Sequence, residues 1–331
     1  MLKLSFILPC YNVERYIADC LNSIYAQGLP EDEFEVICVN DCSTDGTRDI
    51  IAEYVSRHSN LALIDHSKNL TAGGARNTGI NAAQGEYIWF VDPDDVIKPN
   101  CIERLYGIAK REELDVLFFN FDDADENLRI LREDRTYPES KVCNGQEYVL
   151  NYFKGNLSVF GIVWRALYRT VFLQASNLRY PIMRKAQDVV FLWRVMLCAK
   201  RVASLCDAFY VYRSNPYSVM KQQTRARVAF SDRILRGYEI YLMLGKYEVL
   251  PPLAENMRNA VRWCANSSIE LLRLMPKEEK MLYFDEIMNH REAVKVVKSY
   301  MNRKYKLLYD VAFGKRLWVI KAERICDWCT K

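Results

Sequence analysis

The sequence lacks the glycine-rich loops with which the common nucleotide-binding folds hold phosphate groups. No GxGxxG follows the first apolar run, and GxxxxGK[ST] occurs nowhere in the 331 residues. In those motifs the glycines let backbone N–H groups approach the phosphates closely. A diphosphate held by this chain therefore needs another source of positive charge.

Long apolar runs and a strong charge bias are also missing. The run Leu4-Ser5-Phe6-Ile7-Leu8 is too short and too poorly flanked for a signal peptide, and no stretch reaches membrane-spanning length. Lys and Arg number 46 against 42 Asp and Glu, a balance too even to indicate nucleic acid by itself. We expect a folded cytoplasmic protein with no nucleic-acid partner.

Cysteines show no pattern of a disulfide framework. Eleven are scattered through expected strands and helices, Cys20, Cys38 and Cys198 among them, which is typical of small buried residues in a reducing compartment. Cys326 and Cys329 form one CxxC without a second pair, a weak indication of a zinc or redox site.

Strands and helices alternate along the first third of the chain. Each short apolar run is followed by apolar residues at helical spacing, the pattern of a mostly parallel sheet covered by helices on both faces. The sequence predicts an α/β fold with strands at 6–8, 36–39, 61–64 and 87–91.

Polar clusters follow three of these strands. They are Pro9 to Asn12, Asp41 to Asp45, and Asp92 to Asp95. Ligands of such sheets bind beyond the carboxyl ends of the strands, so we expect the three clusters to converge on one cleft.

The cluster Asp92-Pro93-Asp94-Asp95 places three carboxylates in four residues. Their mutual repulsion is relieved by a cation, and Mg²⁺ or Mn²⁺ prefers oxygen ligands while substrate phosphates complete its shell. The alternative is a solvated acidic turn that caps the helix after Pro99.

Four motifs in this order resemble the signature of family 2 glycosyltransferases. They are Pro9-x-Tyr11-Asn12 with Glu14, Asn40-Asp41-x-Ser43-x-Asp45-Gly46, Ala75-Arg76-Asn77-x-Gly79, and Phe90-x-Asp92-x-Asp94-Asp95. The resemblance is strong over residues 3–110, thins out by about 220, and implies a glycosyltransferase A-type fold.

The resemblance also implies a nucleotide-sugar donor, most often a uridine nucleotide, and transfer with inversion. Asp41 would contact the uracil ring, Arg76 the base or the phosphates, and Asp92 the ribose or sugar, while Asp94 would bind Mn²⁺ or Mg²⁺. The base and ribose pocket would be lined by Pro9, Tyr11, Asn12 and Glu14.

Several of these residues have structural alternatives. Asn12 would cap the helix that carries Tyr16, and Ser43 or Asp45 the next helix. Tyr11 would be an ordinary core residue, and His66 is interpreted as a loop residue without a catalytic role.

Transfer to a hydroxyl also needs a group that removes its proton. Asp188 lies at the start of an amphipathic helix with Val190, Trp193 and Leu197 on one face. Its position resembles that of the Asp that serves as general base in the family. Gln187 stands where the family usually has Glu. The alternative is a helix cap, in which case Asp207 and the stretch 122–125 are the next candidates.

Two later segments complete the predicted site. Tyr210 to Ser218 resembles a strand and loop that reach back over the donor, with Arg213 contacting the diphosphate or forming an ion pair. Residues 159–171, with Trp164 and Tyr168, are expected to support the acceptor cleft.

We expect a donor-binding half at 1–110, an acceptor-binding half at 111–230, and an appended helical region at 231–331. From Arg303 onward basic residues alternate with Leu, Phe and Trp. This composition suits peripheral contact with an anionic membrane, packing of a helix on the enzyme, or a homodimer contact.

The sequence favours a metal-dependent glycosyltransferase acting on a glycan or lipid-linked glycan in cell-surface polysaccharide or glycolipid synthesis. One alternative, a nucleotidyltransferase that makes nucleotide sugars, would show a glycine-rich loop near the N-terminus. The other, a catalytically idle carbohydrate-binding relative, would have lost Asp94 or Asp188, and both are present.

Overall fold

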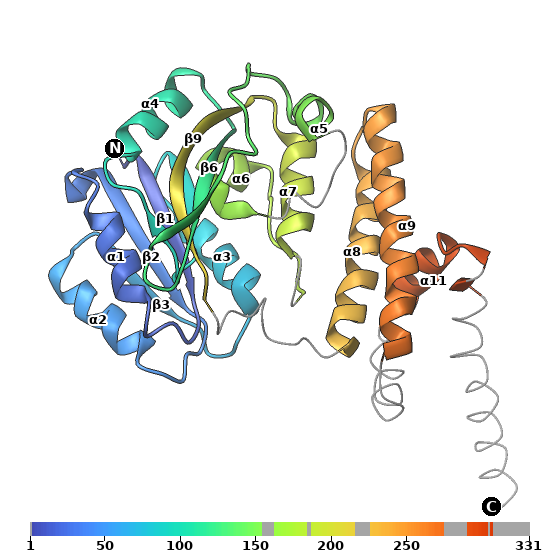
Figure 1. The fold of residues 1–331 in the computed structure, drawn as a ribbon, viewed down its shortest axis with the longest axis horizontal. Helices are drawn as coiled ribbons and strands as arrows, with labels where there is room; N and C mark the ends of the chain where they lie inside the picture. The colour runs from blue at the N-terminus through green and yellow to red at the C-terminus, as the bar shows by residue number, and fades with distance from the viewer. Residues whose placement is uncertain are drawn as a thin grey trace, which may run out of the picture. The chain divides into compact units, whose positions relative to one another are not determined.

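The structure is a computed structural model that describes residues 2–153, 162–183, 187–215, 226–274, 290–303 and 305–306. The chain divides into two compact units, residues 1–221 and 222–331. Figure 1 traces the chain through both units.

The first unit is built on one nine-stranded sheet with the order β3-β2-β1-β4-β8-β6-β9-β5, and β7 pairs with β6. Strands β1 to β4 are parallel, whereas β8 runs antiparallel to both β4 and β6. The strands are β1 (Leu4–Cys10), β2 (Phe34–Asn40), β3 (Leu61–Asp65), β4 (Tyr87–Phe90), β5 (Val96–Ile97), β6 (Val116–Ala124), β7 (Ile130–Asp134), β8 (Ala166–Arg169) and β9 (Val202–Arg213).

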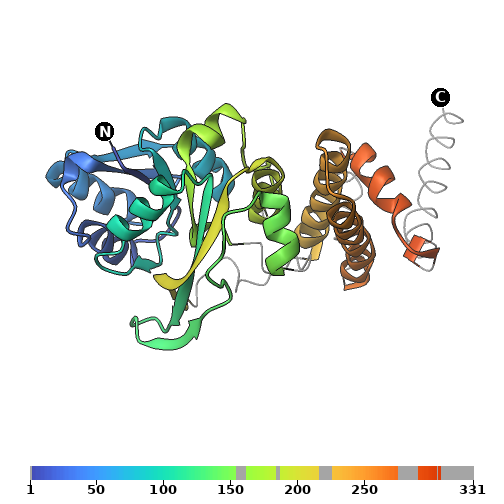
Figure 2. The ribbon, with the colours of Figure 1, turned by 90° about the horizontal axis from the view of Figure 1, so that it is seen from above.

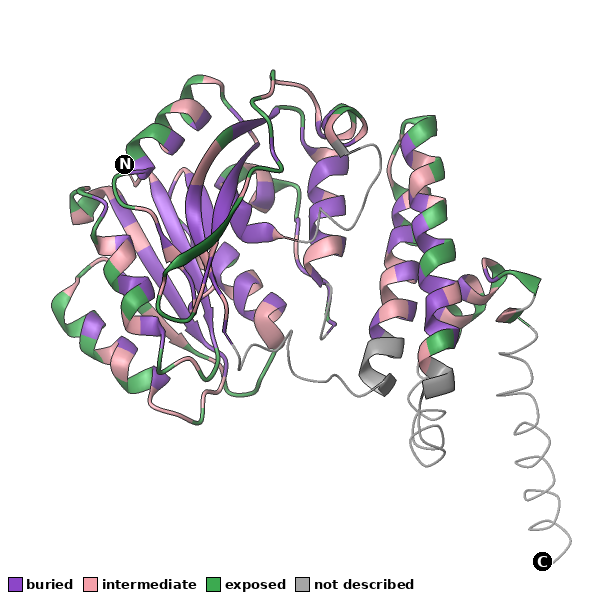
Figure 3. Ribbon diagram, viewed as in Figure 1, coloured by how far each residue is buried: buried purple, intermediate pink, exposed green. Residues whose placement is uncertain are grey.

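Helices cover both faces of this sheet. On one face, side chains of α1, α2 and α4 join a buried cluster with Leu4, Phe6 and Leu8 of β1, and on the other α3 packs against Ile7. Figure 3 shows the central strands of the sheet buried and the outer sides of these helices exposed. The helices are α1 (Ile17–Tyr25), α2 (Thr47–Arg57), α3 (Thr71–Ala82), α4 (Ile102–Arg111), α5 (Gly145–Phe153), α6 (Thr170–Ala175) and α7 (Gln187–Cys198), with 3-10 turns η1 (Glu31–Glu33) and η3 (Val163–Arg165).

The four predicted strands are present, and the first is longer than predicted. It continues through Pro9, which pairs with Val39 of β2. Proline lacks the N–H that a strand between two neighbours uses. Pairing of β1 with β4 ends at Ile7, so Pro9 is paired with a strand on one side only. Its missing N–H therefore breaks no pairing with β4.

Strands β6 and β7 form a hairpin that extends from the sheet (Figure 2). The register of β6 against β9 shifts on both sides of Asn120. The fully buried Asn120 amide satisfies the backbone there, because Nδ2 donates to Cys206 O at 2.9 Å and Oδ1 accepts from Tyr137 N at 2.8 Å. This amide therefore fixes the irregular part of the sheet.

The second unit is helical among its described residues. Its helices are α8 (Ala226–Lys246), α9 (Pro251–Leu274) and α11 (Arg291–Ser299), which share a core that includes Ile234, Ile269 and Val297. The predicted α/β fold with an appended helical region is confirmed.

Residues 307–331 lie outside the described residues, and most of the basic aromatic segment lies there with Cys326 and Cys329. In the described part of the chain no helix has the length and apolarity to cross a membrane. Cys20 and Cys38 are buried as expected, while Cys198 is half-buried.

Close contact between α3 and β1 depends on Gly79. A Cβ there would lie 2.3 Å from Ile7 Cγ2, whereas one at Gly107 in α4 meets nothing within 4 Å. We expect Gly79→Ala to lower the free energy of unfolding by about 1–3 kcal/mol through overpacking, and Gly107→Ala to raise it by up to about 1 kcal/mol. Urea unfolding of both variants checks this, and equal effects would contradict it.

Candidate active site

Loops that follow β1, β2 and β4 meet at one edge of the sheet. The last paired residues are Cys10 with Asn40 between β1 and β2, and Ile7 with Phe90 between β1 and β4. All three strands run in the same direction, so the polar clusters that follow them lie along one edge, as the sequence predicts.

The first two loops are tied together by side chains. Asn12 Oδ1 accepts from Thr44 N at 2.8 Å, and Glu14 Oε2 accepts from Gly46 N at 2.7 Å. Asn12 is therefore not a helix cap, since α1 begins at Ile17 with no side-chain cap. Asn12 has φ 53, a left-handed conformation that Asn tolerates better than most residues.

Two structural alternatives concern Asp45 and Tyr11. Asp45 Oδ1 accepts from Thr47 N at 3.1 Å, but the N-cap of α2 is Gly46 and has no side-chain cap, so Asp45 is not the cap residue. Tyr11 is 45% exposed, so its interpretation as a core residue is wrong. Pro9 is buried within β1.

Arg76 of α3 joins two carboxylates from distant parts of the chain. Its Nη2 donates to Asp92 Oδ1 at 2.6 Å, and its Nη1 donates to Asp188 Oδ1 at 2.9 Å. The Arg76 side chain is 4% exposed, against 26% for Asp92 and 29% for Asp188. One buried guanidinium thus holds the predicted donor contact and the predicted general base at the same place.

The surroundings of Asp188 favour its protonated form more than water does. Burial raises the pKa of Asp188 to about 6, although Arg76 opposes the rise and Asp92 adds to it. Burial alone would lower the pKa of Arg76, but the charges of Asp188 and Asp92 outweigh it and raise that pKa above its ordinary value. Arg76 therefore stays charged between its partners.

The start of α7 positions Asp188. Gln187 is buried, and its Oε1 accepts from Thr71 Oγ1 at 3.3 Å, so the first turn of α7 is fixed against the start of α3. Gly73 makes room for this contact, because a Cβ there would lie 2.3 Å from Gln187 Oε1. The helix is buried on nearly all sides, not only on the predicted Val190, Trp193 and Leu197 face.

The three carboxylates after β4 have different environments. Asp95 is fully buried, accepting from Tyr210 Oη and from Arg213 N, both at 2.7 Å, so it joins the acidic loop to β9. Asp94 is half-buried and accepts from Asn215 Nδ2 at 3.0 Å. Burial raises the pKa of Asp94, and the nearby charge of Asp92 raises it further.

These environments suit a cation at Asp94. Asn215 uses one Asp94 oxygen and Arg76 uses one Asp92 oxygen, so each carboxylate has a second oxygen to offer. A bound cation would offset the burial and repulsion that raise the Asp94 pKa. Asp95, with both oxygens bonded, is not available as a ligand.

Arg213 forms an ion pair, one of the two alternatives for it. Its Nη2 donates to Asp19 Oδ2 at 2.9 Å, and its guanidinium lies 5.1 Å from the centre of the Tyr16 ring. The side chain is 4% exposed. Contact of Arg213 with a diphosphate stays a prediction.

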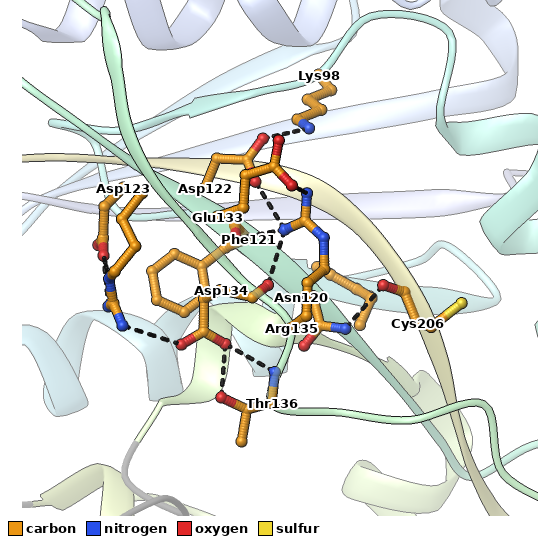
Figure 4. Close-up of polar contacts among 12 residues, drawn as sticks. Lys98, Asn120, Phe121, Asp122, Asp123, Glu133, Asp134, Arg135, Thr136 and Cys206 are labelled. Carbon is orange, nitrogen blue, oxygen red and sulfur yellow. Dashed lines mark hydrogen bonds and ion pairs between the residues drawn. The ribbon is translucent and has the colours of Figure 1, made fainter.

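Asp122 and Asp123, two of the alternative bases, are engaged in ion pairs (Figure 4), and so is Asp207. Asp122 contacts Lys98 and lies 2.7 Å from Arg135, while Asp207 lies 2.6 Å from Arg104. Trp164 and Tyr168, expected to support the acceptor cleft, are buried, and Trp164 stacks on Tyr210 with 4.2 Å between ring centres. Neither ring offers an open face to a sugar.

The model for glycosyl transferase family 2 matches residues 5–174, about half of the chain. This chain belongs to glycosyltransferase family 2. The glycosyltransferase EpsJ of Bacillus subtilis, described as uncharacterised, is 32% identical over 68% of this chain and 69% of its own length. The family resemblance read from the four motifs is confirmed.

The chain is also similar to a named bacterial glucosyltransferase and to a solved crystal structure. The poly(ribitol-phosphate) β-glucosyltransferase of Bacillus spizizenii is 30% identical, and the match spans 64% of this chain but only 32% of that enzyme. The crystal structure of Staphylococcus aureus TarS 1–349 is similar with a TM-score of 0.65 and 25% identity, covering 95% of this chain and 88% of that one. A TarS structure in complex with UDP is equally similar.

Family motifs alone did not reveal several supporting residues. Tyr210, Asn215 and His66 contact Asp95, Asp94 and Asp41 respectively, across 25 residues or more of sequence. The segment from Tyr210 to Ser218 was predicted to reach back over the donor, so its sequence indicated the place of Tyr210 and Asn215 but not their contacts. No local pattern distinguished His66.

The raised pKa of Asp188 predicts a pH-dependent stability. The folded protein holds this proton more tightly than the unfolded chain, so stability falls as pH rises from about 4 to about 6. With a pKa of about 6 in the folded protein and 3.8 in the unfolded chain, the free energy of unfolding falls by at most about 3 kcal/mol over this range. Asp188→Asn should not show this loss, because Asn does not titrate. Urea unfolding of both proteins at pH 4 and pH 7 checks the difference.

Asp122 provides a control because its pKa is shifted in the opposite direction to that of Asp188. Burial opposes the change, but hydrogen bonds and charges from Lys98 and Arg135 keep the pKa of Asp122 below its ordinary value. The stability that wild type gains over Asp122→Asn should therefore shrink as pH falls through the Asp122 pKa. A wild-type advantage over Asp188→Asn that is independent of pH would contradict the account.

Proposed function

We propose that this chain is an inverting glycosyltransferase that moves a sugar from a uridine diphosphate donor to a hydroxyl group of a cell-surface glycan or polyol-phosphate polymer. Support comes from the family, from the UDP complex of TarS and from the polymer-modifying relatives. The nucleotidyltransferase alternative loses its support with the family assignment.

The observation that carries the proposal is the bridge from Arg76 to Asp92 and Asp188. The residue that contacts the donor and the residue that acts as base must lie close together, on the two sides of one reacting carbon. Arg76 holds Asp92 and Asp188 close together because its guanidinium donates to both carboxylates. In a catalytically idle binding protein nothing would require a partly buried carboxylate whose pKa burial raises to about 6.

In the reaction Asp188 accepts the proton of the acceptor hydroxyl. The hydroxyl oxygen forms a bond to the anomeric carbon as the bond from that carbon to the phosphate oxygen breaks, and the nucleoside diphosphate leaves. A pKa of about 6 leaves Asp188 mostly ionised at neutral pH yet more basic than an ordinary Asp. Arg76 keeps the carboxylate oriented.

Asp94 would hold Mn²⁺ or Mg²⁺, with Asp92 as a second carboxylate near it. Such an ion supplies positive charge to the leaving diphosphate. Pro9, Tyr11, Asn12 and Glu14 would form the wall for base and ribose, and Asp41 would face the uracil. These assignments extend the family motifs to this chain.

The acceptor and its location are proposed on sequence alone. The basic aromatic segment from Arg303 onward would bind an anionic membrane surface that carries a lipid-linked acceptor. A homodimer contact through the same segment is the competing use of these residues.

Calorimetry of uridine diphosphate binding tests the donor site. We expect wild type to bind at least about tenfold more tightly with Mn²⁺ than with a chelator, because the ion joins carboxylate and phosphate charges. Asp94→Asn should bind weakly in both conditions. Asp123→Asn, a control on β6 whose carboxylate pairs with Arg132, should behave as wild type. Equal wild-type affinity with Mn²⁺ and chelator would overturn the metal assignment.

A further inference from the structure

Asp41 is held by two groups that use the same carboxylate oxygen. Leu70 N donates to Oδ1 at 2.7 Å, and His66 Nδ1 lies 2.7 Å from the same atom. The Asp41 side chain is 3% exposed and that of His66 is 9% exposed. Both are thus fixed groups at the edge of the sheet, directly after β2 and β3.

A third group contacts the other ring nitrogen of His66. Thr78 Oγ1 of α3 lies 2.9 Å from Nε2. If the Thr78 hydroxyl donates to Nε2, a neutral imidazole carries its proton on Nδ1 and donates it to Asp41. Thr78, His66 and Asp41 then form a chain of hydrogen bonds with one direction.

The other oxygen of Asp41 has no partner in the described part of the chain. Asp41 Oδ2 is buried and accepts no hydrogen bond there. An unsatisfied buried carboxylate oxygen costs free energy, which a ligand N–H recovers on binding.

We propose that His66 is a positioning residue that turns Asp41 into a selector for nucleobases with a ring N–H at the position of uracil N3. This inference rests on the proposed function and deepens it. With His66 and Leu70 both on Oδ1, Oδ2 is a pure acceptor. The N3–H of uracil can donate to it, whereas N3 of cytosine, a base of the same size, is itself an acceptor and donates no hydrogen bond.

Calorimetry in Mn²⁺ with uridine diphosphate and cytidine diphosphate tests the selector. Wild type should prefer uridine diphosphate by at least about tenfold. In His66→Leu, which removes the donor to Asp41, uridine diphosphate should bind about tenfold more weakly while cytidine diphosphate changes less than about twofold, so the preference disappears. A merely structural role would weaken both nucleotides together.

Two further variants distinguish a specific role of His66 from a general folding defect in His66→Leu. His66→Asn places an amide N–H near the Nδ1 position and should restore most of the preference. His58→Leu is the matched control, because His58 also lies 2.6 Å from a carboxylate, Glu31, but at the end of α2 next to the start of β3, the opposite edge of the sheet. It should bind both nucleotides as wild type does.

The outcomes separate this inference from the function beneath it. Wild type that binds neither diphosphate would overturn both. Wild type that prefers uridine diphosphate, with His66→Leu keeping that preference, would overturn the role of His66 alone. Failure of His66→Asn to recover any preference would also contradict it.

Discussion

The buried guanidinium of Arg76 is the constraint on which the candidate site depends. It lies on α3, packed against β1 through Gly79, and it binds carboxylates that are 16 and 112 residues away in the sequence. Breaking a buried ion pair from one side leaves an uncompensated charge, which costs several kcal/mol. Arg76 therefore holds Asp92 and Asp188 relative to the sheet, and Gln187 adds a second contact between the start of α7 and α3.

A second buried carboxylate fixes the other side of the acidic loop. Asp95 binds Tyr210 and the backbone of Arg213, so the end of β9 lies against the loop after β4. Asn215 then lies within 3.0 Å of Asp94. The three carboxylates after β4 thus have different partners: Asp95 bonds to β9, Asp92 pairs with Arg76, and Asp94, which contacts Asn215, is the residue proposed to hold a cation.

Local sequence patterns predicted the parallel strands and the edge at which the motifs meet, because buried apolar runs and strand-end clusters are local features. They did not predict the antiparallel insertion of β8 or the shifted register around Asn120, which depend on pairing between distant segments. For the same reason His66, 25 residues from Asp41, was interpreted as a plain loop residue. Asp95 was grouped with metal candidates because spacing alone does not reveal a buried partner.

We infer that Arg76 presents Asp188 as the base for a donor bound at Asp92 and Asp94. Release of uridine diphosphate from UDP-glucose and UDP-N-acetylglucosamine, with water as the acceptor, tests it in Asp188→Asn, which keeps the size of the side chain and removes its basicity. The account predicts a rate lower by roughly 10²–10⁴ with uridine diphosphate affinity within about twofold of wild type. A near-normal rate, or a loss of affinity that explains the whole effect, would contradict it.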